Sequence, residues 1–324
     1  PMPAVPPAPP YPAETPPRPR PARRRWRFHG PSFAAGLGAV LLLAGAAVFG
    51  YVQYEAWLVL RPARARAQAR PDARLPLRLL RLPVPPVAGR AGAGPTAPDT
   101  LVGYTLPPAD SARGAWVVYL HDVPEHAAAW APRLRYGHMA ALGLGVVCLS
   151  YRGFGASSGS AARITEAALD ADAAAAYGWL RARGVAPGRI FIYGQGMGAA
   201  LALRLAVRQP CAGVVAESAI PGLAEWLRAR YAWLPRGALW RLPLRAPAGS
   251  LGRLPKLFLH ARGDGRVPAS MARGVFAQAP EPRIWVALRG GHGSAPTVSD
   301  SLYRASLRRF IGAASAWNGL APPC

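Results

Sequence analysis

Short apolar runs alternate with longer amphipathic stretches over most of the chain, from Thr100 onward. The runs predict buried strands and the stretches predict helices. The expected strands are 115–120, 145–149, 189–193, 213–216, 256–260 and 284–288, and the expected helices are 161–183, 197–208, 269–278 and 299–311. Such alternation is typical of a mostly parallel, doubly wound sheet covered on both faces. We therefore expect an α/β domain over residues 99–313, followed by a C-terminal tail at 314–324.

A separate hydrophobic run lies near the N-terminus, where residues 30–52 carry no charged side chain. A helix of about 23 residues is long enough to cross a hydrocarbon layer of roughly 30 Å. We expect a transmembrane helix or signal anchor at 31–53. A cleaved signal peptide is the alternative, because Ala44 and Ala46 supply an A-x-A-like site. Arginines are denser before the run than after it, which favours a single-pass protein with a cytoplasmic N-terminus and an extracytoplasmic folded domain.

Composition divides the rest of the N-terminal part into a tail and a linker. Residues 1–30 are rich in proline and arginine and bury too little apolar surface to fold, so we expect a disordered tail. Residues 54–98 return to arginine, proline and alanine, which is typical of a linker or a membrane-skirting segment. The net charge is +24, but no basic stripe is interleaved with aromatics, so we expect no nucleic-acid partner. The three cysteines lack metal-ligand or disulfide spacing, and no cofactor is implied.

The strongest local motif joins a strand to a helix and reads R-I-F-I-Y-G-Q-G-M-G-A-A-L, residues 189–201. Gly194 and Gly198 flank its central residue, as small residues do in a nucleophile elbow. The central residue of such a turn is serine, whose hydroxyl attacks a carbonyl once a histidine removes its proton. This chain has Gly196 there, which suits the strained backbone but has no atom that can attack.

Two further residues complete the order of a catalytic triad. Asp264 follows one expected strand, and His292 lies on a glycine-rich loop after the next. Nucleophile position, aspartate and histidine in this order are typical of α/β-hydrolases. The chain resembles the membrane-anchored α/β-hydrolase family related to acylglycerol lipases, depalmitoylating hydrolases and serine aminopeptidases. The matching stretches are Y-R-G-F-G-A-S-S-G at 151–159, Y-G-Q-G-M-G at 193–198, A-E-S-A at 216–219, and the segments around Asp264 and His292.

The resemblance implies an α/β-hydrolase fold with a short helical lid over the site. The lid corresponds here to about 221–247, a segment that contains Trp226, Trp233 and Trp240. These aromatics either contact acyl chains or a membrane, or they pack the core of the lid. An acyl or lipid-like small molecule is therefore the expected ligand.

The loop after the first core strand departs from the family pattern. Relatives carry His-Gly there and use the nearby backbone, with that of the residue after the nucleophile, here Met197, as an oxyanion hole. This chain reads His121-Asp122-Val123-Pro124. The Asp122 carboxylate would repel a developing oxyanion, and Pro124 removes a donor. The expected pocket residues are His121, Tyr151 and Ser218. Ser218 is also a conceivable substitute nucleophile, but relatives have serine there and use another residue.

Three hypotheses about activity follow from these positions. In the first, serine-type catalysis is impaired and the protein is a pseudoenzyme that binds a lipid, peptide or protein partner. In the second, His292, oriented by Asp264, activates water directly, which is worth about 10² to 10⁴ in rate. In the third, Gly196 is a sequence error and the protein is an ordinary serine hydrolase of acyl esters, thioesters or amides.

Overall fold

The computed structural model of the chain describes residues 30–60, 75–85, 98–159, 164–232 and 242–317. Two compact units divide between Gly50 and Tyr51, and each is described by itself. Residues 1–29 of the tail expected at 1–30, two tryptophans of the expected lid (Trp233 and Trp240) and the last seven residues, 318–324, lie outside the described residues.

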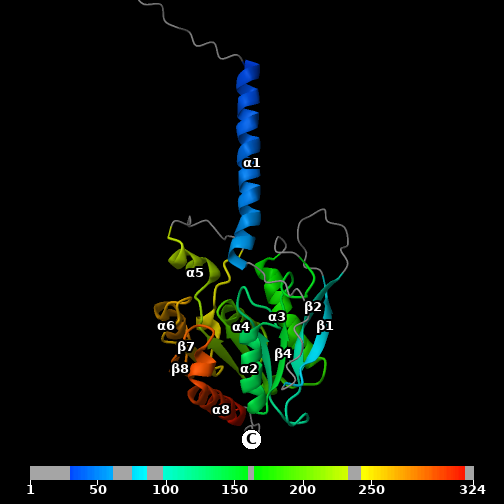
Figure 1. The fold of residues 1–324 in the computed structure, drawn as a ribbon, viewed down its shortest axis with the longest axis vertical. Helices are drawn as coiled ribbons and strands as arrows, with labels where there is room; N and C mark the ends of the chain where they lie inside the picture. The colour runs from blue at the N-terminus through cyan, green and yellow to red at the C-terminus, as the bar shows by residue number, and fades with distance from the viewer. Residues whose placement is uncertain (1–29, 61–74, 86–97, 160–163, 233–241, 318–324) are drawn as a thin grey trace, which may run out of the picture. The chain divides into compact units, whose positions relative to one another are not determined.

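The larger unit is built on a sheet in which eight strands are described, in the order β1-β2-β4-β3-β5-β6-β7-β8 (Figure 1). The strands are β1 Arg78–Val84, β2 Asp99–Leu106, β3 Trp116–Leu120, β4 Gly145–Leu149, β5 Ile190–Gln195, β6 Gly213–Glu217, β7 Lys256–Ala261 and β8 Arg283–Leu288. β3 to β8 pair in parallel, whereas β2 pairs antiparallel with both β1 and β4. The carboxyl ends of the parallel strands therefore meet at one edge, where ligands bind in open α/β sheets.

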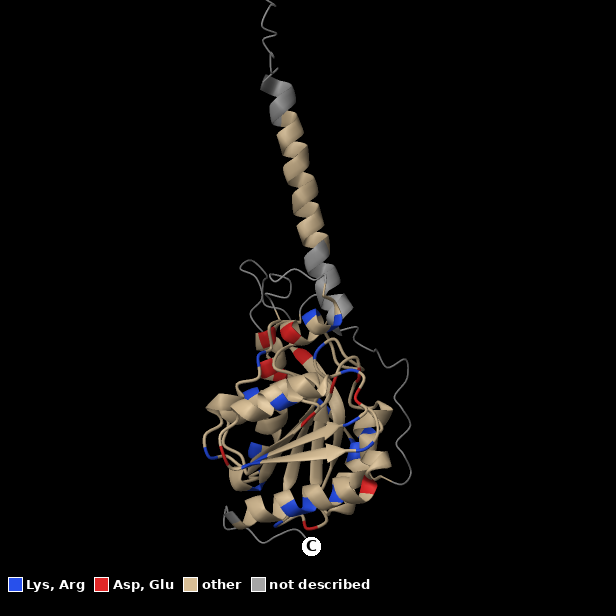
Figure 2. Ribbon diagram, turned by 90° about the vertical axis from the view of Figure 1, so that its left-hand side faces the viewer, with Lys and Arg blue, Asp and Glu red and all other residues tan. Residues whose placement is uncertain are grey.

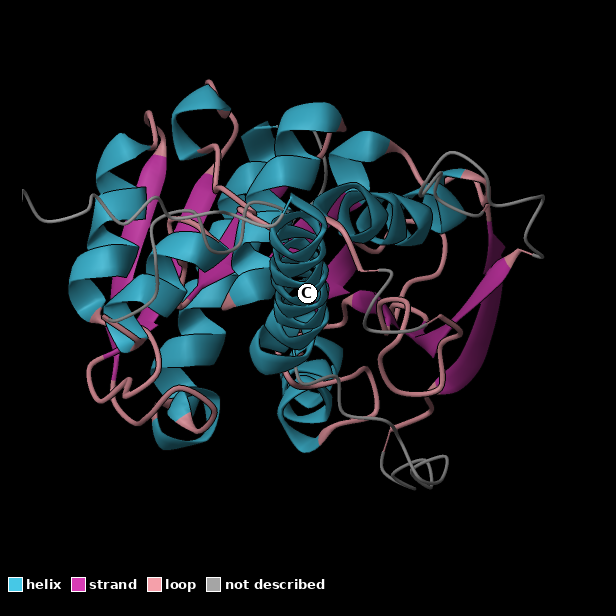
Figure 3. Ribbon diagram, turned by 90° about the horizontal axis from the view of Figure 1, so that it is seen from above, coloured by secondary structure: helices cyan, strands magenta, loops and turns pink. Residues whose placement is uncertain are grey.

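Helices cover both faces of this sheet (Figure 3). The α-helices described from residue 98 onward are α2 Trp130–Ala141, α3 Glu166–Arg181, α4 Met197–Arg208, α5 Leu223–Arg230, α6 Ala269–Gln278, α7 Ala295–Val298 and α8 Asp300–Trp317. Alternate residues of a strand point to opposite faces. Val118 of β3 accordingly belongs to the core shared with α3 and α4, and its neighbour Val117 to the core shared with α2 and α8. The mostly parallel, doubly wound sheet is confirmed.

The expected strands and helices of the α/β domain are all present, with most ends within two residues of expectation and two ends shifted further. α3 begins at Glu166 because Thr165 caps it: the Thr165 hydroxyl accepts from the Ala168 backbone N–H at 3.1 Å. α8 continues to Trp317, so the tail expected from 314 starts too early. The helix continues because Ala314 and Ser315 remain buried.

The linker expected at 54–98 is wrong in one part, because β1 lies within it. β1 runs antiparallel to β2 and places Arg78 opposite Thr105. It forms the edge of the sheet, and most of its residues are exposed or half-buried. Edge strands tolerate charge and proline, here Arg81 and Pro83, which is why this strand reads as irregular sequence.

The uncharged run near the N-terminus forms the long helix α1, Gly30–Leu60. Its side chains are described from residue 35 to 50, where no residue is charged (Figure 2). Large apolar side chains there are exposed, among them Leu42 at 77% and Leu43 at 71%. Within the described residues, no helix meets the length and hydropathy that crossing a membrane requires.

Candidate active site

The turn between β5 and α4 has the geometry of a nucleophile elbow. Gly196 stands at its centre with φ 56° and ψ −117°, in a region that L side chains rarely adopt. A Cβ at Gly194 would lie 1.9 Å from the Gly198 carbonyl oxygen, and one at Gly198 would lie 2.1 Å from the Leu120 carbonyl oxygen. Both flanking glycines are therefore required for strand and helix to approach so closely.

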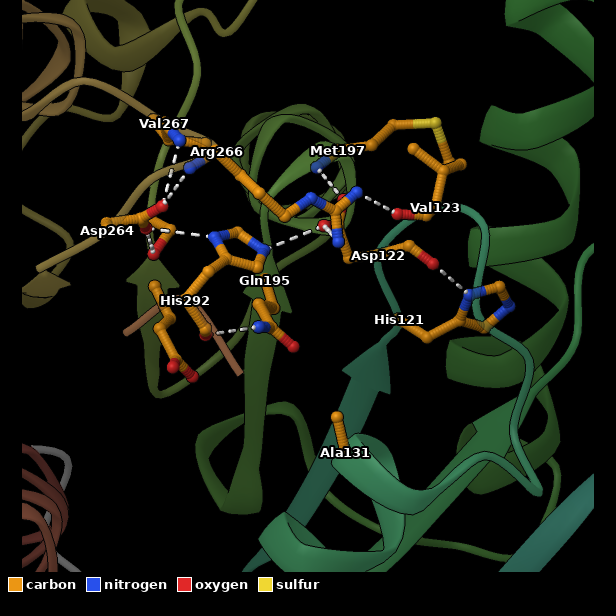
Figure 4. A network of polar contacts seen from close by, with 12 residues as sticks. His121, Asp122, Val123, Ala131, Gln195, Met197, Asp264, Arg266, Val267 and His292 are labelled. Carbon is orange, nitrogen blue, oxygen red and sulfur yellow. Dashed lines mark hydrogen bonds and ion pairs between the residues drawn. The ribbon is translucent and has the colours of Figure 1, made fainter. Parts of the chain in front are cut away.

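Asp264 and His292, from the loops after β7 and β8, meet beside this turn (Figure 4). The Nδ1 atom of His292 lies 2.9 Å from Oδ2 of Asp264. The other carboxylate oxygen of Asp264 accepts from the backbone N–H groups of Arg266 and Val267, at 2.9 and 2.8 Å. The aspartate is thus fixed by its own loop, and it holds the imidazole with Nε2 pointing toward the elbow.

The residue that Nε2 reaches is Asp122, from the loop after β3. The Oδ2 atom of Asp122 lies 2.9 Å from His292 Nε2, and its Oδ1 atom accepts from the Met197 backbone N–H at 2.7 Å. An ideal Cβ built on Gly196 would lie only 2.2 Å from Asp122 Oδ1 and 2.5 Å from Oδ2. The carboxylate therefore occupies the space of the missing serine side chain and takes the donor that an oxyanion hole would offer.

Charge holds this Asp122–His292–Asp264 arrangement together. Burial lowers the pKa of His292, but its hydrogen bonds to Asp122 and Asp264 outweigh burial and raise that pKa to about 9. Burial raises the pKa of both aspartates, but the contacts with His292 prevail and lower each below its usual value. The guanidinium of Arg266, with Nη1 3.5 Å from Asp122 Oδ2, adds to this effect on Asp122. At neutral pH the imidazole is therefore a cation between two carboxylates.

The three residues expected to line the pocket support the site from behind. His121 donates from Nδ1 to the Asp122 carbonyl at 2.9 Å, and Tyr151 donates from its hydroxyl to the His121 carbonyl at 3.0 Å. Burial lowers the pKa of His121 to about 4, so its ring is neutral. Ser218 donates to Asp264 Oδ2 at 2.7 Å. None of the three lies in the wall of the described cavity beside the elbow. His121 and Tyr151 instead hold the Asp122 loop in place through these hydrogen bonds.

The cavity at the site is small and mostly apolar. Only about 10 Å³ is open to the centre of a water-sized molecule. Trp226 of α5 lies in its wall, so the described part of the expected lid does cover the site, and its indole N–H donates to the Arg266 carbonyl at 2.7 Å. The apolar wall residues are Val123, Met197, Ile220, Leu223, Trp226 and Val267. Over the described residues, no group of three or more His, Cys, Asp or Glu side chains is placed to hold a metal ion.

A buried polar network beneath the elbow was not expected from the sequence. Glu217, at the end of β6, accepts from Arg135 Nε at 2.8 Å and from the Tyr193 hydroxyl at 2.5 Å. The Tyr193 and Tyr303 hydroxyls lie 2.6 Å apart. Arg135 of α2 is fully buried, which is rare for an arginine. The one available signal was Glu217 itself, a carboxylate at the end of an otherwise apolar strand.

Comparison with known proteins agrees with this geometry. Residues 111–257 match the family described as serine aminopeptidase, S33. The uncharacterized protein Rv2307c of Mycobacterium tuberculosis is 36% identical over 174 residues, which are 52% of this chain and 60% of that protein. The chain thus spans 60% of the length of the curated relatives that it matches.

Solved structures share the fold at low sequence identity. The Pyrococcus furiosus esterase Pf2001 superposes with a TM-score of 0.60 and 16% identity, over 79% of this chain and 97% of that chain. The structure named putative hydrolase from Agrobacterium vitis S4 superposes with a TM-score of 0.57 and 18% identity, over 73% of this chain and 99% of that chain. The chain is an α/β-hydrolase by fold, and its residues 111–257 resemble the serine aminopeptidase S33 family.

Proposed function

We propose that this chain is a membrane-tethered α/β-hydrolase that has lost serine-type acyl transfer. The observation that carries the proposal is the position of Asp122. Serine-type chemistry needs a nucleophile, a free base and a free oxyanion donor. Gly196 supplies no nucleophile, His292 Nε2 is engaged by Asp122 Oδ2, and the Met197 N–H is engaged by Asp122 Oδ1.

The same contacts argue against the other two hypotheses from the sequence. A histidine that activates water must be neutral, but the raised pKa of His292 keeps it protonated at pH 7. A serine at 196 would collide with the Asp122 carboxylate, since even its Cβ would lie 2.2 Å from Oδ1. Gly196 and Asp122 therefore fit each other, which favours Gly196 as the genuine residue.

The ligand class remains the acyl or lipid-like molecule expected from the sequence. Its support is the apolar wall of the cavity, to which Val123, Leu223 and Trp226 contribute. The present volume admits water but no acyl chain, so a ligand would require α5 to move.

An ester-hydrolysis series tests the loss of serine-type activity. We expect the full chain in detergent to be silent on p-nitrophenyl butyrate, and Gly196→Ser to be silent as well because Asp122 still fills the space. The double variant Asp122→Gly with Gly196→Ser restores the family pattern and should gain activity. Adding His292→Ala to that double variant is the control and should abolish the gain. Turnover by the unmodified chain that disappears in His292→Ala would contradict the proposal.

The membrane tether rests on the uncharged run at 30–52 and on the exposed apolar side chains of α1. A helix that is apolar on all sides needs an apolar environment. Alkaline carbonate extraction of cells that express the full chain tests this. We expect the chain to stay in the membrane pellet and Leu42→Arg to weaken retention, since an arginine at the centre of a span costs about 2.5 to 3.5 kcal/mol. Leu302→Arg, on the exposed face of α8, is the matched control. Release of the unmodified chain into the supernatant would contradict the tether.

Protease protection tests the proposed orientation. With the N-terminus in the cytoplasm, protease added outside intact cells should degrade the α/β domain. Full protection of that domain would reverse the orientation.

A further inference from the structure

We propose that Asp122 itself is a nucleophile, supplied by the loop after β3 in place of the missing serine, and that it attacks the saturated carbon of an alkyl substrate with an anionic leaving group. The inference rests on the proposed loss of serine-type acyl transfer. Asp122, which prevents serine-type acyl transfer, is then the reactive group in the attack on the saturated carbon.

The placement of the carboxylate is the first argument. Asp122 lies in the cavity wall and stands where a nucleophile on the elbow would stand. The Met197 N–H holds Oδ1, so Oδ2 is the attacking oxygen, through the lone pair that its contact with His292 Nε2 leaves unused. His292 and Arg266 keep the carboxylate ionised, because together they hold the pKa of Asp122 below its usual value against the effect of burial. A charged, oriented and partly desolvated carboxylate is a competent nucleophile.

The chemistry of a carboxylate selects the electrophile. If Asp122 attacked an acyl ester, the tetrahedral intermediate would expel the carboxylate again, because it is a much better leaving group than an alkoxide. At a saturated carbon no such reversal occurs. Asp122 Oδ2 forms the new C–O bond while the bond from carbon to the leaving group breaks, and the leaving group departs with the electron pair. The half-exposed guanidinium of Arg266, 3.5 Å from Oδ2, offers a positive charge to the departing anion.

The Met197 N–H, the oxyanion donor, is placed to act in the second step, the hydrolysis of the Asp122 ester, rather than in the first. Water attacks Cγ of the Asp122 ester, and the negative charge develops on Oδ1. The Met197 N–H lies 2.7 Å from that atom, within the range at which such donors act. The intermediate collapses by breaking the bond between Cγ and the alkyl-bearing oxygen. His292 takes the proton from the water and returns it to the leaving alkoxide, so the products are an alcohol, the halide or similar anion, and one proton.

The contact between His292 and Asp122 also determines at which step His292 can act as a base. The Asp122 carboxylate is one of the two groups that raise the pKa of His292 to about 9. Formation of the ester removes this negative charge, so the pKa falls and the ring loses its proton. Nε2 becomes a base at the stage at which water must be activated, while Asp264 still orients the ring through Nδ1.

The apolar wall of the cavity suits a hydrocarbon chain. Val123 and Leu223 lie on it with Trp226, and the charged residues there, Asp122, Arg266 and His292, are those assigned to the reaction. A chain enters only when α5 moves away, since the present space holds about one water.

Trapping of the ester tests the proposal on the full chain in detergent, with 1-iodohexane as probe. His292→Ala should accumulate a hexyl ester on Asp122, because loss of a general base slows its hydrolysis by about 10² to 10⁴-fold. Intact mass spectrometry detects one added hexyl group, and peptide mapping locates it. Hydroxylamine removes an ester but leaves a thioether, which separates Asp122 from alkylated cysteines such as Cys148 and Cys211. The matched control is Asp122→Asn with His292→Ala, which keeps the shape at 122 and should form no ester.

Isotope labelling distinguishes this route from direct attack by water on the substrate. In a single turnover of the unmodified chain in H₂¹⁸O, the label should enter the Asp122 carboxylate and leave the 1-hexanol unlabelled. Labelled alcohol, or no ester in His292→Ala, overturns the inference. The ester assay on p-nitrophenyl butyrate judges the proposed function separately. If that assay is silent and no adduct forms, only the present inference fails; if the unmodified chain cleaves the acyl ester, the proposed function fails.

Discussion

The carboxylate of Asp122 fills the space in which any side chain at Gly196 would stand. A Cβ on Gly196 would lie 2.2 Å from Asp122 Oδ1 and 2.3 Å from its Cγ. The two residues come from different loops, Gly196 after β5 and Asp122 after β3, yet the side chain of one occupies the space beside the backbone of the other. A side chain at 196 therefore requires the Asp122 carboxylate to move or to be removed.

The first prediction concerns the stability cost of a side chain at 196. Gly196→Ala should destabilise the chain by more than about 2 kcal/mol, because a left-handed backbone costs an L residue about 1 to 2 kcal/mol and the methyl group also displaces Asp122. In an Asp122→Ala background the steric part disappears, so the two substitutions should couple by about 0.5 to 3 kcal/mol. Urea unfolding of the four proteins measures this coupling.

Gly274→Ala is the matched control for that cycle. Gly274 lies within α6, where an added Cβ meets nothing within 4 Å. Alanine there should stabilise the helix by roughly 0.5 to 1 kcal/mol. If Gly196→Ala cost no more in the presence of Asp122 than in its absence, the two residues would not share the space.

The second prediction is the titration of His292. Its pKa of about 9 lies above the ordinary value of 6.5, so the native protein binds this proton more tightly than the unfolded chain. The resulting stability is complete below pH 6.5 and is lost as pH rises through 9. Asp122, whose pKa is lowered, contributes stability that is present above its ordinary value of 3.8 and lost as pH falls. The arrangement should therefore stabilise the fold most between about pH 4 and 6.5.

NMR of the imidazole resonances measures this titration directly. Asp122→Asn removes one carboxylate and should lower the pKa of His292 toward its ordinary value. His126, which is half-buried and whose pKa burial lowers, is the internal reference and should not change. An unaltered His292 titration in Asp122→Asn would show that the ion pair does not form in solution.

Most of the parallel strands were predictable because they are buried on both faces, whereas β8 is half-buried and was predictable from its apolar residues 284–288. β4 and β6, for example, are fully buried and read as continuous apolar runs. The antiparallel strand β1 was not, since an edge strand exposes much of its surface and tolerates Arg81 and Pro83. Sequence therefore indicated the parallel strands of the sheet better than its antiparallel edge strand.

The site was predictable in its positions but not in its contacts. The order of Gly196, Asp264 and His292 along the chain, on successive loops at one edge of the sheet, indicated that they would meet. The sequence also indicated that Asp122 would oppose an oxyanion. That Asp122 occupies the oxyanion position itself depends on contacts with His292 and Met197, which are 170 and 75 residues away in the chain. No local pattern encodes such a side-chain conformation.

The third prediction concerns the buried Arg135–Glu217 pair. Arg135→Met should destabilise the chain by about 3 to 5 kcal/mol, because it leaves the Glu217 carboxylate buried without its cation. Arg304→Met removes the same side chain from the exposed pair with Asp300 and should cost less than about 1 kcal/mol. Equal losses for the two variants in urea unfolding would contradict the assignment. A compensating Glu217→Leu in the Arg135→Met background should recover part of the loss, since the unpaired charge is then gone.

The fourth prediction concerns Glu125, which lies three residues beyond Asp122. Burial, aided by the negative charge of Asp122, raises the pKa of Glu125 from 4.5 to about 7. Its Oε2 atom is buried and has no hydrogen-bond partner among the described residues. A carboxyl whose pKa is higher in the native state binds its proton more tightly there, so the fold loses stability as pH rises from 4.5 through 7.

Glu125→Gln imitates the protonated form and should remove this loss. The variant and the unmodified chain should be equally stable near pH 4.5, and the variant should become the more stable of the two above pH 7. Glu281→Gln also removes one negative charge, but Glu281 is exposed and has a lowered pKa, so it is ionised at every pH compared. Its stability curve should run parallel to that of the unmodified chain between pH 5 and 8. If Glu125→Gln ran parallel as well, Glu125 would be ionised and solvated in the native protein, and neither burial nor the charge of Asp122 would raise its pKa.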